Sequence, residues 1–177
     1  GGGFGSRFVA PRVDGIDACL VGEPSGWLRN WQGLHLVSRG VCCFRIRVHG
    51  TQMHSSLSDR MPSVNASQHM ARLLASLEDE VELDFTPHPL DGGSPTLNVG
   101  VIVSGGVYFG VVPGLAEFGC DLRTLPGMTE AGVRAALERW PATRREQDPQ
   151  LHAEPVFEPG PQGSRKRAGG GEGGDRR

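Results

Sequence analysis

The pattern of apolar and polar residues along the chain predicts a regular succession of strands and helices. From Leu34 to Val48 apolar positions alternate with polar ones, which is typical of a strand with one buried face. After Pro62, apolar residues recur at three- and four-residue steps and indicate an amphipathic helix. Its apolar stripe comprises Ala66, Met70, Leu73, Leu74, Leu77 and Val81. We expect Asp79, Glu80 and Glu82 to form its solvated end, and His69 to lie on its surface.

The second half of the chain predicts the same kinds of element. A loop rich in Pro, Gly and Asp is expected over 85–95, followed by strands from Thr96 to Val103 and from Leu115 to Leu125. Thr129 offers an N-cap hydroxyl to a second, shorter helix. Leu151 to Phe157 is the last predicted strand. The apolar stripe of the second helix comprises Val133, Ala136, Leu137 and Trp140.

The resulting order is strand, helix, strand, strand, helix, strand, which predicts an α+β fold of the split βαβ (ferredoxin-like) type. In that arrangement an antiparallel sheet carries two helices on one face. We assign this domain to residues 40–158. Upstream, an apolar run within Val13 to Val21 predicts a short buried strand. The family resemblance described below implies that 1–39 is a remnant of an α/β domain. The tail, 159–177, is rich in Gly and Arg and is expected to be disordered or non-native.

Composition narrows the classes of partner. The formal net charge is −2, which gives no electrostatic basis for binding nucleic acid or an anionic membrane. No apolar run approaches the roughly 18 residues that a membrane span needs. The four cysteines have no CxxC spacing, so we interpret them as reduced thiols of a cytoplasmic protein. The expected partner is a small molecule or another protein.

Four residues are candidates for chemistry, each with a simpler alternative. Glu23 lies on a turn at a predicted strand end, where a carboxylate can ligate a metal, although a surface glutamate fits equally. His54 lies in a polar loop and can donate to an oxyanion, or it is merely solvated. Asn98 interrupts an apolar strand and needs hydrogen-bond partners from the protein or from a ligand. Arg123 can bind a carboxylate with two hydrogen bonds, or pair with Asp121.

Taken in order, these segments resemble the zinc-dependent amidohydrolase family of acetylornithine deacetylase, succinyl-diaminopimelate desuccinylase, aminoacylase and glutamate carboxypeptidase. The series, more than any one tripeptide, makes the resemblance specific. The matching pieces are Asp17-Ala18-Cys19-Leu20-Val21-Gly22-Glu23-Pro24-Ser25, Arg39-Gly40, Val48-His49-Gly50, His54-Ser55-Ser56, Asn65-Ala66, Thr96-Leu97-Asn98-Val99-Gly100, Gly105-Gly106, Val112-Pro113 and Asp121-Leu122-Arg123.

The resemblance implies that the split βαβ domain is a dimerisation lid and that 1–39 belongs to a metal-binding catalytic domain. It implies a homodimer with two zinc ions per site, or cobalt or manganese in their place, that hydrolyses an N-acyl amino acid or peptide amide beside a free carboxylate. Glu23 would be a metal ligand, and His54 would contact the oxyanion across the dimer. Asn98 and Arg123 would bind the substrate.

Two interpretations of the chain therefore remain. The family's His-x-Asp ligands, its Glu-Glu pair and its late histidine have no match in these residues, so we expect that the 177-residue fragment does not hydrolyse amides by itself. The alternative is a non-catalytic split βαβ module for dimerisation or effector binding, which explains the missing ligands without truncation. The Gly22-Glu23-Pro24 segment favours the first interpretation, because it has no purpose in a module made only of the lid.

Overall fold

The computed structural model describes residues 10–15, 17, 18, 20 and 36–158 of the chain. The chain divides into two units, one formed by Gly1–Trp31 with Pro159–Arg177 and the other by Gln32–Glu158. In the first unit the described residues form one 3-10 helix, η1 (Ala10–Arg12). The described part of the strand predicted within Val13 to Val21 is not a strand. Its remaining residues, Glu23 and the predicted tail lie outside the described residues.

The second unit has the predicted order of long elements. It also contains a small two-stranded sheet and a short 3-10 helix that the sequence did not predict. The elements are β1 (Gly40–His49), β2 (Met53–His54), η2 (Ser55–Leu57), α2 (Ala66–Glu80), β3 (Thr96–Gly105), β4 (Val111–Val112), β5 (Leu115–Thr124), α3 (Glu130–Gln147) and β6 (His152–Phe157). The predicted loop before β3 is confirmed.

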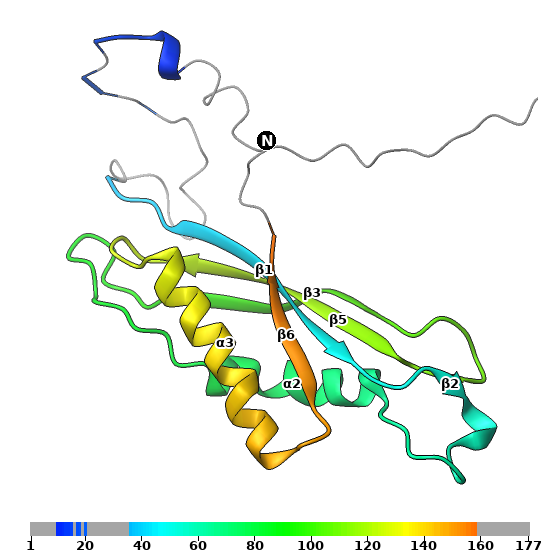
Figure 1. The fold of residues 1–177 in the computed structure, drawn as a ribbon. Helices are drawn as coiled ribbons and strands as arrows, with labels where there is room; N and C mark the ends of the chain where they lie inside the picture. Colours follow the sequence, from blue (N-terminus) through cyan, green and yellow to red (C-terminus); the bar gives the residue numbers. More distant parts are fainter. Residues whose placement is uncertain (1–9, 16, 19, 21–35, 159–177) are drawn as a thin grey trace, which may run out of the picture. The chain divides into compact units, whose positions relative to one another are not determined.

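The four long strands form one antiparallel sheet in the order β3-β5-β1-β6, shown in Figure 1. β1 and β3, which α2 connects along the chain, are therefore separated by β5 in the sheet. This is the split βαβ arrangement predicted from the sequence. β1 starts at Gly40, opposite Thr124, rather than at Leu34. The described residues before Gly40 have no strand partner because β5 ends at Thr124.

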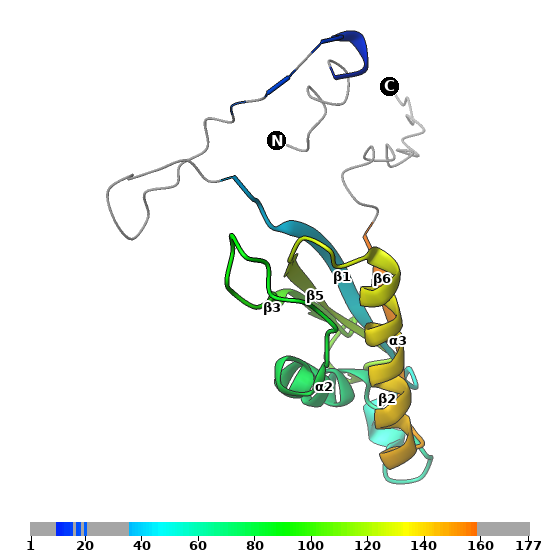
Figure 2. The ribbon, with the colours of Figure 1, turned by 90° about the vertical axis from the view of Figure 1, so that its left-hand side faces the viewer.

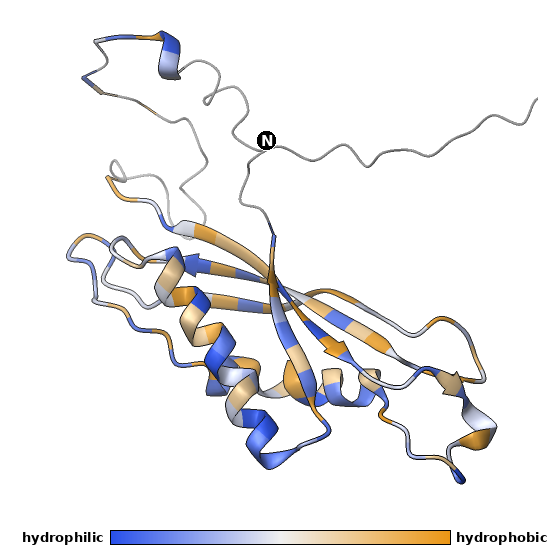
Figure 3. Cartoon of the chain, in the orientation of Figure 1, coloured by the Kyte–Doolittle hydropathy of each residue, from blue (hydrophilic) through white to orange (hydrophobic). Residues whose placement is uncertain are grey.

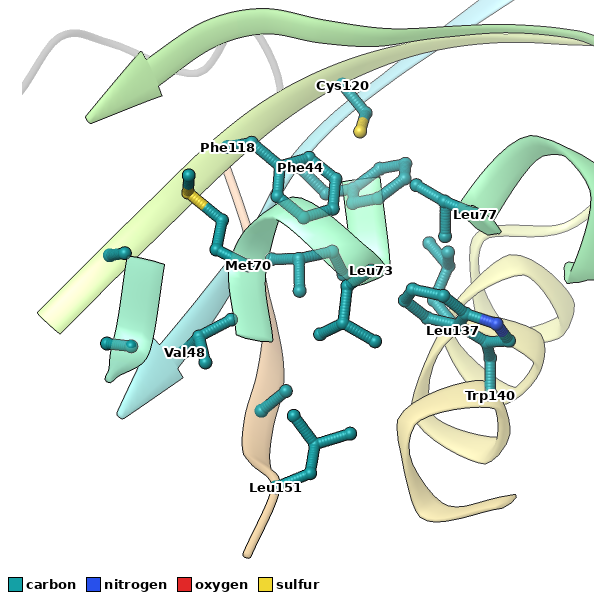
Figure 4. Close-up of a cluster of buried hydrophobic side chains, with 14 of the residues drawn as sticks. Phe44, Val48, Met70, Leu73, Leu77, Phe118, Cys120, Leu137, Trp140 and Leu151 are labelled. Atoms are coloured by element: carbon teal, nitrogen blue, oxygen red, sulfur yellow. The ribbon is translucent and has the colours of Figure 1, made fainter. Parts of the chain in front are cut away.

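One face of this sheet is covered by both helices, as Figures 1 and 2 show. Alternate residues of β1, Phe44, Ile46 and Val48, are at most 1% exposed and pack in the same cluster as Phe118 of β5. α2 and α3 contribute their apolar stripes to this cluster (Figure 4). Each such side chain contributes about 1.5–3 kcal/mol by burial, so this cluster is the main source of stability. We call this face of the sheet the covered face.

α2 begins where the sequence predicts, because the Asn65 side chain accepts a hydrogen bond from Gln68 N at 3.1 Å. The predicted surface position of His69 is wrong. His69 is 7% exposed, and its Nδ1 lies 3.1 Å from Asp148 Oδ2 at the end of α3. The sequence pattern gave no sign of this contact because the partner lies 79 positions further along the chain.

α3 is longer than predicted, with 18 residues against 15 in α2. It continues through Pro141 although proline lacks the N–H that the helix interior uses. The turn after Pro141 is held from outside the helix, because Arg144 forms an ion pair with Glu80. Trp140 Nε1 also donates to Glu80 Oε2 at 2.9 Å. Glu80 is therefore a bridge between the helices, and the prediction that it is only a solvated end is wrong.

β3 is an edge strand with an irregular middle. Gly100 has a φ of +75°, a conformation that favours glycine, and the pairing with β5 shifts between Val99 and Ile102. After this bulge Val101, Ile102 and Val103 are each more than half exposed. Within the described residues, β3 thus presents an apolar outer edge. Figure 3 marks the alternation of hydrophobic and hydrophilic residues along the strands.

Candidate functional site

The loop that carries His54 is fixed to its surroundings by main-chain hydrogen bonds. Gly50 N donates to Gly114 O at 2.8 Å, and Ser55 N donates to Gly110 O at 2.8 Å. Between these two bonds, β2 pairs with β4. A loop tied down at both ends holds its side chains in defined directions. His54 is therefore an exposed residue on a rigid support rather than on a free loop.

The His54 side chain has a defined hydrogen-bond pattern. It is the N-cap of η2, with φ −65° and ψ 129°, and its Nδ1 accepts from Ser56 N at 3.2 Å. Ser56 Oγ lies 2.8 Å from the same nitrogen. Nε2 has no partner among residues 36–158. His54 can thus direct one ring nitrogen to a ligand while the other is held by the chain.

A polar cavity of about 560 Å³ lies next to the His54 loop. It is bounded by η2, the start of α2, β4 and the residues that follow α3. Hydroxyl, amide, imidazole and guanidinium groups dominate its walls, so its surface can hydrogen-bond to a polar molecule. Its polar lining includes Ser55, Ser58, Ser63, Gln68, His69, Arg72 and Asp148.

Asn98 and Arg123 lie together on the other face of the sheet, which we call the open face because no described helix covers it. Asn98 is opposite Asp121, and Arg123 is two residues further along β5. Arg123 Nη2 donates to Asp121 Oδ2 at 2.8 Å. The buried Oδ1 of Asp121 has no hydrogen-bond partner among the described residues. The salt-bridge alternative considered for Arg123 therefore exists in the structure, and it leaves an acceptor unused.

The structure does not bring His54 close to Asn98 and Arg123 within one chain. β5 runs from Leu115, near the His54 loop, to Thr124, beside Arg123. The eight residue-to-residue steps from Leu115 to Arg123 span about 27 Å in an extended strand. The two groups of candidates therefore lie at opposite ends of the sheet. A site that uses both groups needs more than one copy of this domain.

Between these ends the open face carries a network of charged side chains. Glu117 accepts from Arg45 Nη1 at 2.7 Å and from Arg47 Nη2 at 3.2 Å. The hydrogen bond from Arg45 lowers the pKa of the Glu117 carboxyl below its usual value, and Arg47 adds to this effect against the opposing effect of burial. Glu117 is therefore held ionised between two arginines. Arg45 also pairs with Glu158, so two carboxylates face the two arginines in this network.

The described residues do not provide a metal site. Residues 36–158, together with the short described stretches before them, contain no group of three or more His, Cys, Asp or Glu side chains placed to hold a metal. Glu23, the predicted ligand, lies outside the described residues. The donor set of the lid thus does not fit a two-metal centre, and we derive no step through one.

No helix in the described parts is long and apolar enough to cross a membrane.

Sequence reasoning missed the contact of Ser56 with His54 and the unused acceptor of Asp121, although it named Asp121 as a possible partner of Arg123. Ser56 contacts His54, and Asp121 lies between Asn98 and Arg123. A serine two residues after a histidine at the start of a short helix is a pattern of local side-chain capping, and it could have been recognised. The unused acceptor of Asp121 depends on the sheet register, which the sequence alone does not give.

Comparison with known proteins assigns the domain. Residues 36–149 match the M20 peptidase dimerisation domain, which covers more than half of the chain. The chain therefore belongs to the M20 peptidase family through this domain. The match confirms the resemblance found in the sequence, and it includes all elements from β1 to α3.

Relatives of the chain are enzymes of that family. It is 29% identical over 140 residues to succinyl-diaminopimelate desuccinylase of Stenotrophomonas maltophilia (strain K279a), which covers 76% of this chain and 36% of the relative. It is 32% identical over 125 residues to acetylornithine deacetylase of Myxococcus xanthus, covering 67% of this chain and 30% of the relative. The chain thus spans about a third of the length of these curated relatives.

Among solved structures, the chain is similar to an amidase of the hydantoinase/carbamoylase family from Burkholderia multivorans. The TM-score is 0.48 and the sequence identity 21%, with 68% of this chain and 27% of that chain covered.

Proposed function

We propose that the chain is the lid part of a metal-dependent amidohydrolase that cleaves an N-acyl amino acid or peptide amide beside a free carboxylate. The observation that carries the proposal is the match of 36–149 to a peptidase dimerisation domain, combined with relatives named as a desuccinylase and a deacetylase. The antiparallel sheet with two helices supports the same assignment.

In this proposal His54 donates a hydrogen bond to the oxyanion that forms when water attacks the amide carbonyl. A donor aimed at developing negative charge stabilises the transition state more than the substrate, and losing one such donor costs about 10²–10³ in kcat. The rigid loop and the unpartnered Nε2 support this role. Because His54 lies at the opposite end of the sheet from Asn98 and Arg123, His54 acts on the site of a second subunit.

Asn98 and Arg123 are proposed to bind the substrate carboxylate. A guanidinium binds a carboxylate with two parallel hydrogen bonds, and an amide N–H adds a third. Arg123 is half exposed and paired with Asp121 through one nitrogen, which leaves other N–H groups for a ligand. Substrate binding at this end would therefore use the guanidinium edge that Asp121 leaves free.

Glu23 is proposed as one ligand of a zinc pair, or of cobalt or manganese, in a longer protein that contains this chain. In that longer protein a bound metal would lower the pKa of its water and so would supply hydroxide. One carboxylate cannot build a two-metal site, so the remaining ligands would come from other segments. A cytoplasmic location belongs to the same proposal and is supported by the free thiols of Cys42, Cys43 and Cys120.

We infer that the homodimer forms through the outer edge of β3. An edge strand with exposed apolar side chains is a template for pairing with another strand, and most homodimers use a two-fold axis. Val101, Ile102 and Val103 provide such an edge. Pairing β3 with its copy would join two sheets into one and cover part of the surface of these three side chains.

The test is an assay of the longer protein with a panel of N-acetyl and N-succinyl amino acids and dipeptides, in the presence of zinc or cobalt. We expect amide hydrolysis that a chelator abolishes and that added metal restores. A matched variant, His54→Ala, should lose about 10²–10³ in kcat with little change in metal content. Absence of both metal binding and hydrolysis across the panel would contradict the proposal.

A further inference from the structure

Ser56 makes two contacts with the same nitrogen of His54. Its backbone N–H donates to Nδ1 at 3.2 Å, and its hydroxyl oxygen lies 2.8 Å from that atom. Both residues are exposed at the start of η2, where no buried core dictates how the ring turns. The position of the imidazole is therefore set by these local hydrogen bonds.

The first contact decides which nitrogen carries the proton. A backbone amide can only donate, so the atom that faces it must offer a lone pair. A neutral imidazole has one N–H and one lone pair, so a lone pair on Nδ1 leaves the proton on Nε2. The hydroxyl can donate or accept, but beside an unprotonated Nδ1 it must donate. The amide contact thus specifies the tautomer, and the hydroxyl, as a donor to the same nitrogen, reinforces it.

We propose that Ser56 is a positioning residue that holds His54 in the tautomer with its proton on Nε2. His54 then presents an N–H donor, and not a lone pair, in the direction away from its own loop. This inference deepens the proposed function and rests on it, because the donor matters only if His54 contacts an oxyanion. The tautomer itself is a property of the 177-residue chain and can be measured without activity.

The hydroxyl is the part of Ser56 that substitution can remove. Its contact with Nδ1 is 2.8 Å, and the backbone amide contact at 3.2 Å does not depend on the side chain. Without the hydroxyl the ring keeps one longer hydrogen bond and gains freedom to rotate. Ser56→Ala therefore weakens the restraint, whereas Ser56→Thr retains a hydroxyl at the same place.

The experiment is nitrogen-15 NMR of the histidine side chains in the full 177-residue chain, with His54→Asn to assign the His54 signals. We expect wild-type His54, when neutral, to be a single tautomer protonated at Nε2. Ser56→Ala should give averaged shifts that show a mixture, and Ser56→Thr should restore the wild-type spectrum. A proton on Nδ1 in the wild type, or an unchanged tautomer in Ser56→Ala, would overturn the proposal.

Ser58→Ala is the matched control. Ser58 lies in the same turn, but its hydroxyl donates to Ser55 O at 2.8 Å and does not touch His54. It should leave the His54 signals unchanged, which separates loss of the Ser56 hydroxyl from general loosening of the turn. If Ser58→Ala shifts the tautomer as much as Ser56→Ala does, the assignment to Ser56 is wrong.

In the longer enzyme, Ser56→Ala should lower kcat about 10-fold and leave KM within about 2-fold, because the lost alignment acts on the transition state. The two kinds of measurement separate the failures. A correct tautomer with no effect of His54→Ala on kcat would contradict the proposed role of His54, whereas a wrong tautomer would contradict this inference alone.

Discussion

The two faces of the sheet differ in what holds them and in what they can do. On the covered face, Phe44, Ile46 and Phe118 are at most 1% exposed and belong to the same cluster as buried residues of both helices. On the open face, Arg45, Arg47 and Glu117 compensate one another's charge and remain partly exposed. The covered face therefore supplies the stability of the fold. The open face and the adjoining loops are left to carry polar chemistry.

The largest effect should come from the covered face. Phe118→Ala removes a fully buried ring from the centre of β5 and should lower the free energy of unfolding by about 3–5 kcal/mol. Urea denaturation followed by circular dichroism measures the loss. Phe109→Ala is the control, since it removes the same ring at a position that is 92% exposed. A comparable loss of unfolding free energy in the control would contradict the claim that burial on the covered face stabilises the fold.

The second effect concerns the outer edge of β3, where neither face protects the side chains. Ile102→Lys places a charge on the edge that we propose to pair, so the dimer should dissociate at about 100-fold higher concentration. Sedimentation velocity over a concentration series measures this shift. Leu90→Lys is a matched control on an exposed loop residue. Equal dimer stability in the two variants would exclude pairing through β3.

The smallest effect should come from the open face. Glu117→Gln breaks the charge pairing with Arg45 and Arg47 and should cost about 1 kcal/mol at neutral pH. The pKa of Glu117 is lowered in the folded protein, so its contribution is present above the unfolded pKa of the carboxyl. It disappears as pH falls through the lower folded value. The difference between wild type and variant should therefore shrink below about pH 4.

Thermal unfolding from pH 7 to pH 3 checks this prediction. Glu138→Gln, at an exposed position of α3, removes the same charge without breaking an ion pair among the described residues. It should give no comparable dependence on pH. A difference for Glu117→Gln that grows as pH falls would reverse the sign that the salt bridges require.

The covered face could be predicted from the sequence because periodicity depends only on which side chains are apolar. The stripes of α2 and α3, and the alternation in β1, were sufficient to give the split βαβ order. The wrong predictions concern residues whose environment is set by partners far away in the sequence. Glu80 is joined to Trp140 and Arg144, 60 and 64 positions away. A two-residue strand such as β2 has no period to detect.

The candidate site was predictable only in part. The motif series named His54, Asn98 and Arg123, but it could not say that the first lies at the opposite end of the sheet from the other two. The register of β1 with β5 fixes that separation, and register depends on tertiary packing. The contact of Ser56 with His54 and the position of Asp121 opposite Asn98 were missed, because hydrogen bonds and register leave little trace in a pattern of hydrophobicity.

The central claim is that His54 serves the site of a partner subunit, and mixing two inactive variants of the longer protein tests it most directly. His54→Ala and Glu23→Ala homodimers should each be inactive. If His54 acts across the dimer, subunit exchange creates heterodimers with one intact site, and activity should return to roughly a quarter of the wild-type value. If His54 acts within its own subunit, every site in the mixture carries a defect. No recovery of activity after confirmed subunit exchange would contradict the account.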